Sequence, residues 1–200
     1  MRIAIVVWSL LLSINVFAQK NIRPVLWVGP SDNVAVYGIN ISPIVFKLPT
    51  NSVVNGINIE GIGVPFFLYM IPFDPTDNVD TVSFTNDFTI NGLNLAPAGI
   101  LQHGTVNGIA GTIMYSFVSQ VNGVEFSLFF NITYRLNGVS VSIQNSTVEL
   151  YGLQIGLFNT AKRTKGVQLG LINKTGKLKG LQIGIWNINE KRKFPLINWS

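Results

Sequence analysis

The chain has 200 residues, which is enough for one domain, and 12% of them are charged. It has no cysteine and a single histidine, so disulfide bonds and the usual His and Cys zinc sites are excluded. Lys and Arg outnumber Asp and Glu by 14 to 9, which gives a net charge of +5 at pH 7.

The N-terminal segment, 1–18, has the features of a secretory signal peptide. Arg2 supplies the positive start, residues 3–12 form an apolar core, and residues 16–18 resemble a cleavage site before Gln19. The apolar run is too short for a convincing membrane helix. We therefore expect an exported protein with a single domain over residues 19–200. It would reside in the outer membrane or at the cell surface, or else be periplasmic or secreted, and nucleic acid is not expected as a partner.

The clearest pattern in the chain is an internal repeat over residues 152–187. Three copies begin at Gly152, Gly166 and Gly180, with a period of 14 residues, and read GLQIGLFN, GVQLGLIN and GLQIGIWN. Apolar residues alternate with Gly and Gln, which is the period-two pattern of a β-strand. A helix is disfavoured because each glycine would cost it about 1 kcal/mol.

Weaker copies of this unit precede the clear ones. Each contains a marker glycine, usually after Asn and before an apolar residue. The spacing of these glycines shortens along the chain from about 18 residues to about 14 residues, with one gap of double length after Gly56. The earlier marker glycines are Gly38, Gly56, Gly92, Gly108, Gly123 and Gly138. We expect one all-β repeat domain of about nine to twelve short strands.

Two arrangements of these strands fit the repeat. An antiparallel meander, curled or closed into a barrel, is favoured by residues 173–177, whose Asn, Lys, Thr and Gly have the composition of a hairpin turn. This register places Leu169 opposite Leu181. A β-solenoid of parallel coils is the alternative, and the strict period of 14 residues favours it. The solenoid would stack Leu153, Val167 and Leu181 and align Asn159, Asn173 and Asn187 in a ladder.

The alternation defines one aliphatic and one polar column of residues. We expect the aliphatic column to be hidden, either in a protein core or in lipid, and the polar column to face away from it. Leu169→Asp should then destabilise the protein severely, whereas Gln168→Ser should be mild. The aliphatic column is Ile39, Ile57, Leu93, Ile109, Val124, Val139, Leu153, Val167 and Leu181; the polar column is Asn40, Asn58, Asn94, Ala110, Glu125, Ser140, Gln154, Gln168 and Gln182.

The repeat units resemble a known family. The three clear copies, with the ending NINEKRKFPLINW at residues 187–199, are similar to bacterial surface-repeat proteins built from G-[LV]-Q-[LI]-G-[LI]-x-N units. The N-terminal NGI and NGL units look like the divergent copies of such proteins, so the resemblance covers essentially the whole chain after the signal. It implies export and a cell-envelope or surface setting, and it brings no catalytic residues.

No residues form a recognisable catalytic, cofactor or metal site, so we expect no enzyme activity and no cofactor. His103 lies beside Gly104 without a nucleophile motif, and the carboxylates Asp74, Asp77 and Asp80 match no calcium-loop spacing. We interpret these acidic residues as a solvated turn. Glu60, Glu125 and Glu149 are isolated on strands, and the pKa of Glu125 would be raised if it pointed into a cavity. Asn-x-Ser/Thr triplets are interpreted as turn and ladder residues, at Asn40, Asn131, Asn145, Asn173 and Asn198.

Basic residues are concentrated near the C-terminus. Nine of the 14 Lys and Arg lie within residues 162–193, where Glu190 is the only acidic residue. In a solenoid they would form one basic stripe, able to contact anionic lipid headgroups or polysaccharide; as charged turns, they would instead keep the sheet soluble. The candidate contacts are Lys162, Arg163, Lys165, Lys174, Lys177, Lys179, Lys191, Arg192 and Lys193.

The sequence thus predicts an exported cell-envelope repeat protein with a structural or interaction role. Two alternatives remain open at this point. One is a small outer-membrane barrel, acting as a pore or an anchor. Its aliphatic positions would span only about 14 Å of an apolar band about 25 Å tall. The other is a surface module that binds an anionic glycan or lipid through its basic turns.

Overall fold

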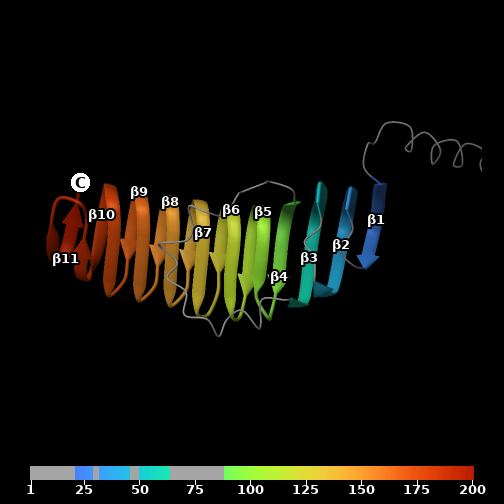
Figure 1. Cartoon of the computed structure of the whole chain (residues 1–200), viewed down its shortest axis with the longest axis horizontal. Helices are drawn as coiled ribbons and strands as arrows, with labels where there is room; N and C mark the ends of the chain where they lie inside the picture. Colours follow the sequence, from blue (N-terminus) through green and yellow to red (C-terminus); the bar gives the residue numbers. More distant parts are fainter. Residues whose placement is uncertain (1–20, 29–31, 46–49, 64–87) are drawn as a thin grey trace, which may run out of the picture.

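The computed structural model describes residues 21–28, 32–45, 50–63 and 88–200. In these ranges, eleven β-strands form one sheet in chain order and give an elongated molecule (Figure 1). The strands are β1 (Asn21–Val28), β2 (Val34–Val45), β3 (Ser52–Gly63), β4 (Phe88–Ala96), β5 (Ile100–Thr112), β6 (Tyr115–Phe126), β7 (Phe130–Val141), β8 (Gln144–Ile155), β9 (Phe158–Leu169), β10 (Ile172–Ile188) and β11 (Lys193–Trp199).

Strands β1 to β10 all run parallel to their neighbours, and only β11 pairs in the antiparallel direction. From β5 to β10, each strand is followed after a few residues by a parallel neighbour, which a separate crossover could not achieve. Each strand is instead bent into one turn of a continuous coil. The fold is therefore a β-solenoid, as the alternative interpretation predicted, and the antiparallel meander or closed barrel is wrong.

The register of the last coils confirms the solenoid prediction in detail. Val167 pairs with Leu181, Gln168 with Gln182, and Leu169 with Ile183, whereas the meander required Leu169 to face Leu181. Residues 173–177 do not form the expected hairpin turn. They continue β10, and the Thr175 side chain among them is buried.

The chain bends at the marker glycines. Gly166 has a φ angle of +151°, a conformation that residues with a Cβ rarely adopt. Its Cα also stacks directly against the preceding coil, so that an added Cβ would overlap the carbonyl oxygen of Gly152. The marker glycine is therefore required both by the bend and by the close stacking of successive coils.

The two columns of the repeat are placed oppositely to our expectation. Gln154, Gln168 and Gln182 of the polar column have no exposed surface, whereas Ile109 and Val124 of the aliphatic column are 48% and 40% exposed. The polar column thus points into the coil and the aliphatic column points outward. The physical reason is that stacked amides satisfy one another: Gln168 Nε2 donates to Gln154 Oε1 at 2.8 Å, and Gln182 Nε2 to Gln168 Oε1 at 2.8 Å.

The apolar core comes from a different part of each coil. Two residues before most marker glycines stands an aliphatic residue that is almost fully buried, and these residues stack along the axis. They are Val36, Val54, Ile90, Val106, Val121, Leu136 and Leu150. The interior is therefore mixed. These buried aliphatic residues pack on one side of it, and the polar column lies on the other side.

The last strand covers the end of the solenoid. Asn198 of β11 is fully buried and its Nδ2 donates to Gln182 Oε1 at 2.9 Å, which completes the glutamine ladder. Arg192 stacks over the Trp199 ring at 4.3 Å and its Nε donates to Asn198 Oδ1 at 2.8 Å. Reversing the strand direction thus ends the parallel stack. The described residues include no helix with the length and hydropathy needed to span a membrane.

Candidate functional site

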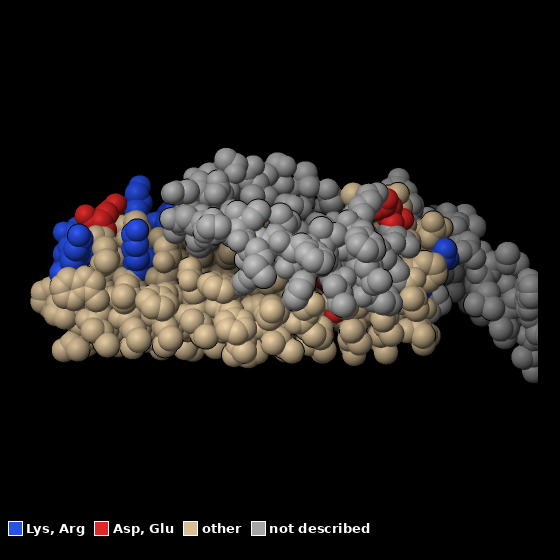
Figure 2. Space-filling view, turned by 60° about the horizontal axis from the view of Figure 1, so that its bottom comes forward, with Lys and Arg blue, Asp and Glu red and all other residues tan. Residues whose placement is uncertain are grey.

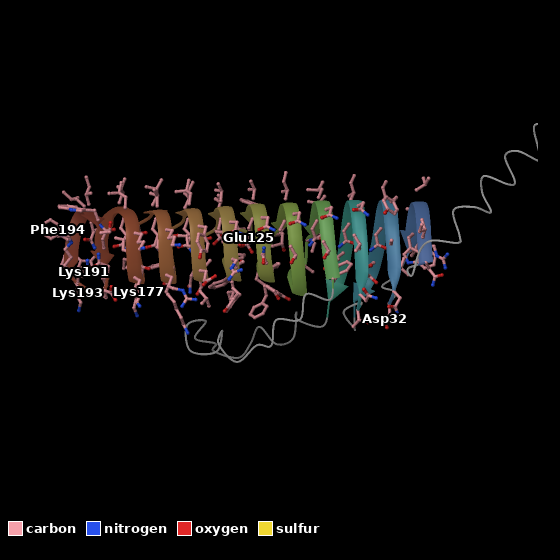
Figure 3. All side chains as sticks on the ribbon, turned by 90° about the horizontal axis from the view of Figure 1, so that it is seen from above. Asp32, Glu125, Lys177, Lys191, Lys193 and Phe194 are labelled. Carbon is pink, nitrogen blue, oxygen red and sulfur yellow. The ribbon has the colours of Figure 1, made fainter. Side chains whose placement is uncertain are left out.

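The outer surface of the solenoid has two sides of different chemistry. Figure 2 shows Lys and Arg gathered over the C-terminal coils along the upper edge, above a long surface of other residues. In Figure 3, Lys177, Lys191 and Lys193 lie at one long edge, and side chains drawn almost entirely as carbon project along the opposite edge. We call these the basic side and the apolar face.

The basic side is built by the parallel register. Lys177 pairs with Arg163, Lys179 pairs with Lys165, and Lys174 pairs with Thr160 of the preceding coil. Like charges directly across a ladder are unfavourable for folding. Among the described residues, no carboxylate lies within salt-bridge distance of Lys174, Lys177 or Lys179. All nine predicted contact residues lie in β9, β10, β11 or the link between the last two.

Glu149 neutralises part of the positive charge on the basic side by forming ion pairs with two arginines. Its carboxylate lies 2.6 Å from Arg135 Nη2 and 2.6 Å from Arg163 Nη2, on the coils to either side. Burial raises the pKa of Glu149, but the hydrogen bonds and charges of Arg163 and Arg135 outweigh it and lower that pKa overall. The same carboxylate raises the pKa of Arg163. This ion-paired network is therefore structural, and within the described ranges Lys174, Lys177 and Lys179 remain without a carboxylate partner.

A groove of about 380 Å³ lies on the basic side of the last coils. Its floor and walls come from β8, β9, β10 and the link that follows β10. Lys162 and Lys174 line it, together with Glu190 and the backbone of Gly176. Thr160 belongs to the same lining, whereas the hydroxyls of Thr147 and Thr175, two further lining residues, are hydrogen-bonded inside the coil to Gln154 and Thr164.

Glu125 occupies the polar column of β6, where the last coils carry glutamine. It has no exposed surface and accepts hydrogen bonds from Ser116 Oγ at 2.6 Å, Thr133 Oγ1 at 2.7 Å and Ser140 Oγ at 3.3 Å. Burial raises the pKa of Glu125, and these three hydrogen bonds oppose the rise. Figure 3 places it inside the coil, so this carboxyl is a structural group enclosed by the chain.

The remaining predicted candidates do not converge on a site. Asp74, Asp77 and Asp80 and the signal at residues 1–18 lie outside the described residues. His103 belongs to β5, but its side chain is not described. Asn40, Asn131, Asn145, Asn173 and Asn198 are buried in the interior. Within the described ranges, no three His, Cys, Asp or Glu residues are placed to hold a metal ion.

Comparisons with known proteins add no identification. No family model, no curated protein and no solved structure matches the chain. The resemblance to surface-repeat proteins therefore stays a prediction.

Sequence reasoning found the basic residues but missed two features of the surface. The groove combines residues from β8 to the link after β10, and only the three-dimensional stacking of coils brings them together. The exposed apolar face was missed because aliphatic alternation normally marks the buried side of a strand. The signal that could have revealed it is the identity of the alternating polar residue, since repeated Gln and Asn can stack in a closed interior.

Proposed function

We propose that this protein is an exported, non-enzymatic surface module that binds an anionic glycan or lipid headgroup through its basic side. The observation that carries the proposal is the stacking of uncompensated lysines on β10 beside basic residues of β9. Such stacking opposes folding, and an anionic ligand would remove the repulsion.

The groove supports the same proposal. Phosphate, sulfate or carboxylate groups repeated along a polymer can contact Lys162 and Lys174, which line it together. The coil spacing of about 4.8 Å makes the charges regular along the axis. A periodic anion is thus a better match than a compact one.

The export signal and the family resemblance supply the cellular setting of the proposal. An exported bacterial protein meets anionic glycans and lipid headgroups in the cell envelope. Both partners share the same charged groups, and the binding experiment separates them.

The test uses the mature chain with Lys174, Lys177 and Lys179 changed together to Gln. Binding to an immobilised sulfated or carboxylated polysaccharide is measured beside binding to vesicles with anionic headgroups. We expect affinity to fall at least about tenfold, because three surface contacts of roughly 0.5 kcal/mol each correspond to that factor. Added salt should weaken wild-type binding.

The matched control changes the same three lysines to Arg, which keeps the charge and should keep the binding. Equal binding by the Gln and Arg variants would contradict the proposal. Binding to polysaccharide alone identifies a glycan ligand, and binding to vesicles alone identifies a headgroup.

A further inference from the structure

The apolar face is an extended surface of the described strands that the proposed function does not use. It consists of the outward apolar side chains one and three residues after the marker glycines, in two columns that follow the solenoid axis and are interrupted at Gly111. Ile39, Ile57, Leu95, Ile109, Val124, Phe126, Ile155 and Ile183 on this face are between 36% and 48% exposed. A second row, the apolar ridge, adjoins it at Leu128, Ile143, Leu157, Leu171 and Ile185.

The size of this face is at the upper end of the apolar patches found on monomeric proteins. Nine coils spaced by about 4.8 Å and a strand segment of about 13 Å give an area on the order of 600 Å². The largest apolar patch on a monomeric protein is typically about 300–600 Å², and here the ridge adds to the face. A surface of this extent and chemistry normally marks a contact site.

We propose that the apolar face is the interface of a homodimer, in which a second copy of this chain packs face to face. Two faces would hide on the order of 1,200 Å², and the ridges would increase the area, which reaches the range of stable specific interfaces. A two-fold interface must be complementary to itself. Columns of near-identical aliphatic residues with a constant spacing meet this requirement.

The edge of the apolar face favours a protein partner over lipid. Along β3 to β7, the residue before each marker glycine is an asparagine. These amides form an external ladder in which each Nδ2 donates to the Oδ1 of the asparagine in the preceding coil at 2.6 to 2.8 Å. The members are Asn55, Asn91, Asn107, Asn122 and Asn137. An apolar centre with a neutral polar rim is the usual anatomy of a protein interface.

The distribution of charge points the same way. A face that lay on an anionic bilayer would be expected to carry Lys and Arg along its whole border. Of the Lys and Arg in the described strands, only Lys165 and Lys179 directly precede a marker glycine at this border, and both lie in the last coils. Packing two apolar faces together would also leave both basic sides exposed to ligand.

The test measures the mass of the mature protein in solution by sedimentation or light scattering across a concentration series. We expect a dimer whose melting temperature rises with concentration, because association stabilises the folded state. Changing Ile109 and Val124 together to Asp should raise the dimer dissociation constant by a factor on the order of 100, because charge is buried without a partner. Thr160→Asp, which adds a charge to the other side, should leave the mass of the dimer unchanged.

A milder pair, Ile109→Thr with Val124→Thr, keeps the β-branched shape and guards against misfolding of the Asp variant. It should be folded by circular dichroism and should also dissociate at higher concentrations than the wild type. A wild type that is monomeric throughout the series overturns the proposal. Binding of that monomer to uncharged phosphatidylcholine vesicles, lost in the Asp variant, would assign the face to lipid instead.

Discussion

The N-terminal and C-terminal coils have the same backbone path but differ in the polar residues that occupy their interior. In β2 to β7 the polar column holds Asn, Ala, Glu or Ser, and the coils shorten along the chain. The marker glycines are 18 residues apart at Gly38 and Gly56 but 15 residues apart at Gly108 and Gly123. In β8 to β10 the polar column is Gln in each coil, and the period is constant at 14 residues. An interior ladder by itself does not require a constant period, because Asn40, Asn58 and Asn94 also form one across separations of 18 and 36 residues. It requires only that each coil presents an amide at the same height.

The border position before the marker glycine shows a second contrast. Asparagine fills it in β3 to β7, whereas Tyr151, Lys165 and Lys179 fill it in β8 to β10. The same backbone therefore accepts a neutral amide or a lysine at this place. Folding alone does not require the lysines, and this makes their concentration in the last coils the strongest reason to assign them a role in binding.

The marker glycine is common to both regions, and replacing it should have the largest effect. Gly166→Ala puts a Cβ at a φ angle of +151° and against the Gly152 carbonyl, so we expect a loss of at least about 3 kcal/mol. Hydrogen exchange should locate the loss in β8 to β10, because each coil contacts only its neighbours.

Gly111→Ala is the matched control for this prediction. Gly111 has no positive φ angle, and the nearest atom to an added Cβ is Leu95 Cδ2 at 3.3 Å, on a flexible side chain. Its stability should change by less than about 1 kcal/mol. Comparable losses in the two variants would show that the bend does not depend on the marker glycine.

The second prediction concerns the glutamine ladder of the C-terminal coils. Gln168→Leu leaves the buried Gln154 Oε1 without its donor and removes the acceptor of Gln182 Nε2, so we expect a loss of about 1–3 kcal/mol. Leu169→Asp, at the next and outward-facing residue, should cost less than about 1 kcal/mol in dilute protein. This order reverses the one expected from alternation alone. Chemical denaturation of both variants measures it, and a larger loss for Leu169→Asp would restore the original face assignment.

The sequence predicted the existence and the length of the repeating unit but preferred the wrong direction of the strands. Period-two alternation is the same for parallel and antiparallel strands, so residues 173–177 decided the preference through their turn-like composition. The turn-forming tendency of this segment is outweighed by the stacking of each Gly, Gln and Asn on the equivalent residue of the next coil. An antiparallel register would not allow this stacking. The strict periodicity of the last three copies was the better guide.

The site was predicted as a set of residues and not as a surface. Charge clustering in the sequence identified the basic residues, and only parallel stacking brings Lys177 beside Arg163. The apolar face could not be recognised because its residues have the composition of a core. Deciding which column is enclosed requires knowing that Val106 and its equivalents already supply the aliphatic interior.

The smallest effect on stability should come from Glu125→Gln. This change gives β6 the glutamine that fills the polar column in the C-terminal coils. Because burial raises the pKa of Glu125 above its ordinary 4.5, its carboxyl favours the folded state fully below the unfolded pKa and loses that contribution as the pH rises through the folded pKa. The Gln variant should therefore melt a few degrees above the wild type at pH 8, and this gain should disappear near pH 4.

Glu149→Gln supplies a control with the opposite sign. Arg163 and Arg135 lower the pKa of Glu149, so its contribution is present above the unfolded pKa and is lost as the pH falls through the folded pKa. That variant should melt below the wild type at pH 8 and approach it in acid. Thermal melts at several pH values measure both. If the melting temperatures of the two variants shifted in the same direction relative to the wild type, Glu125 would behave as an ordinary ion-paired carboxylate. It would then share with the glutamine column only its place in the coil.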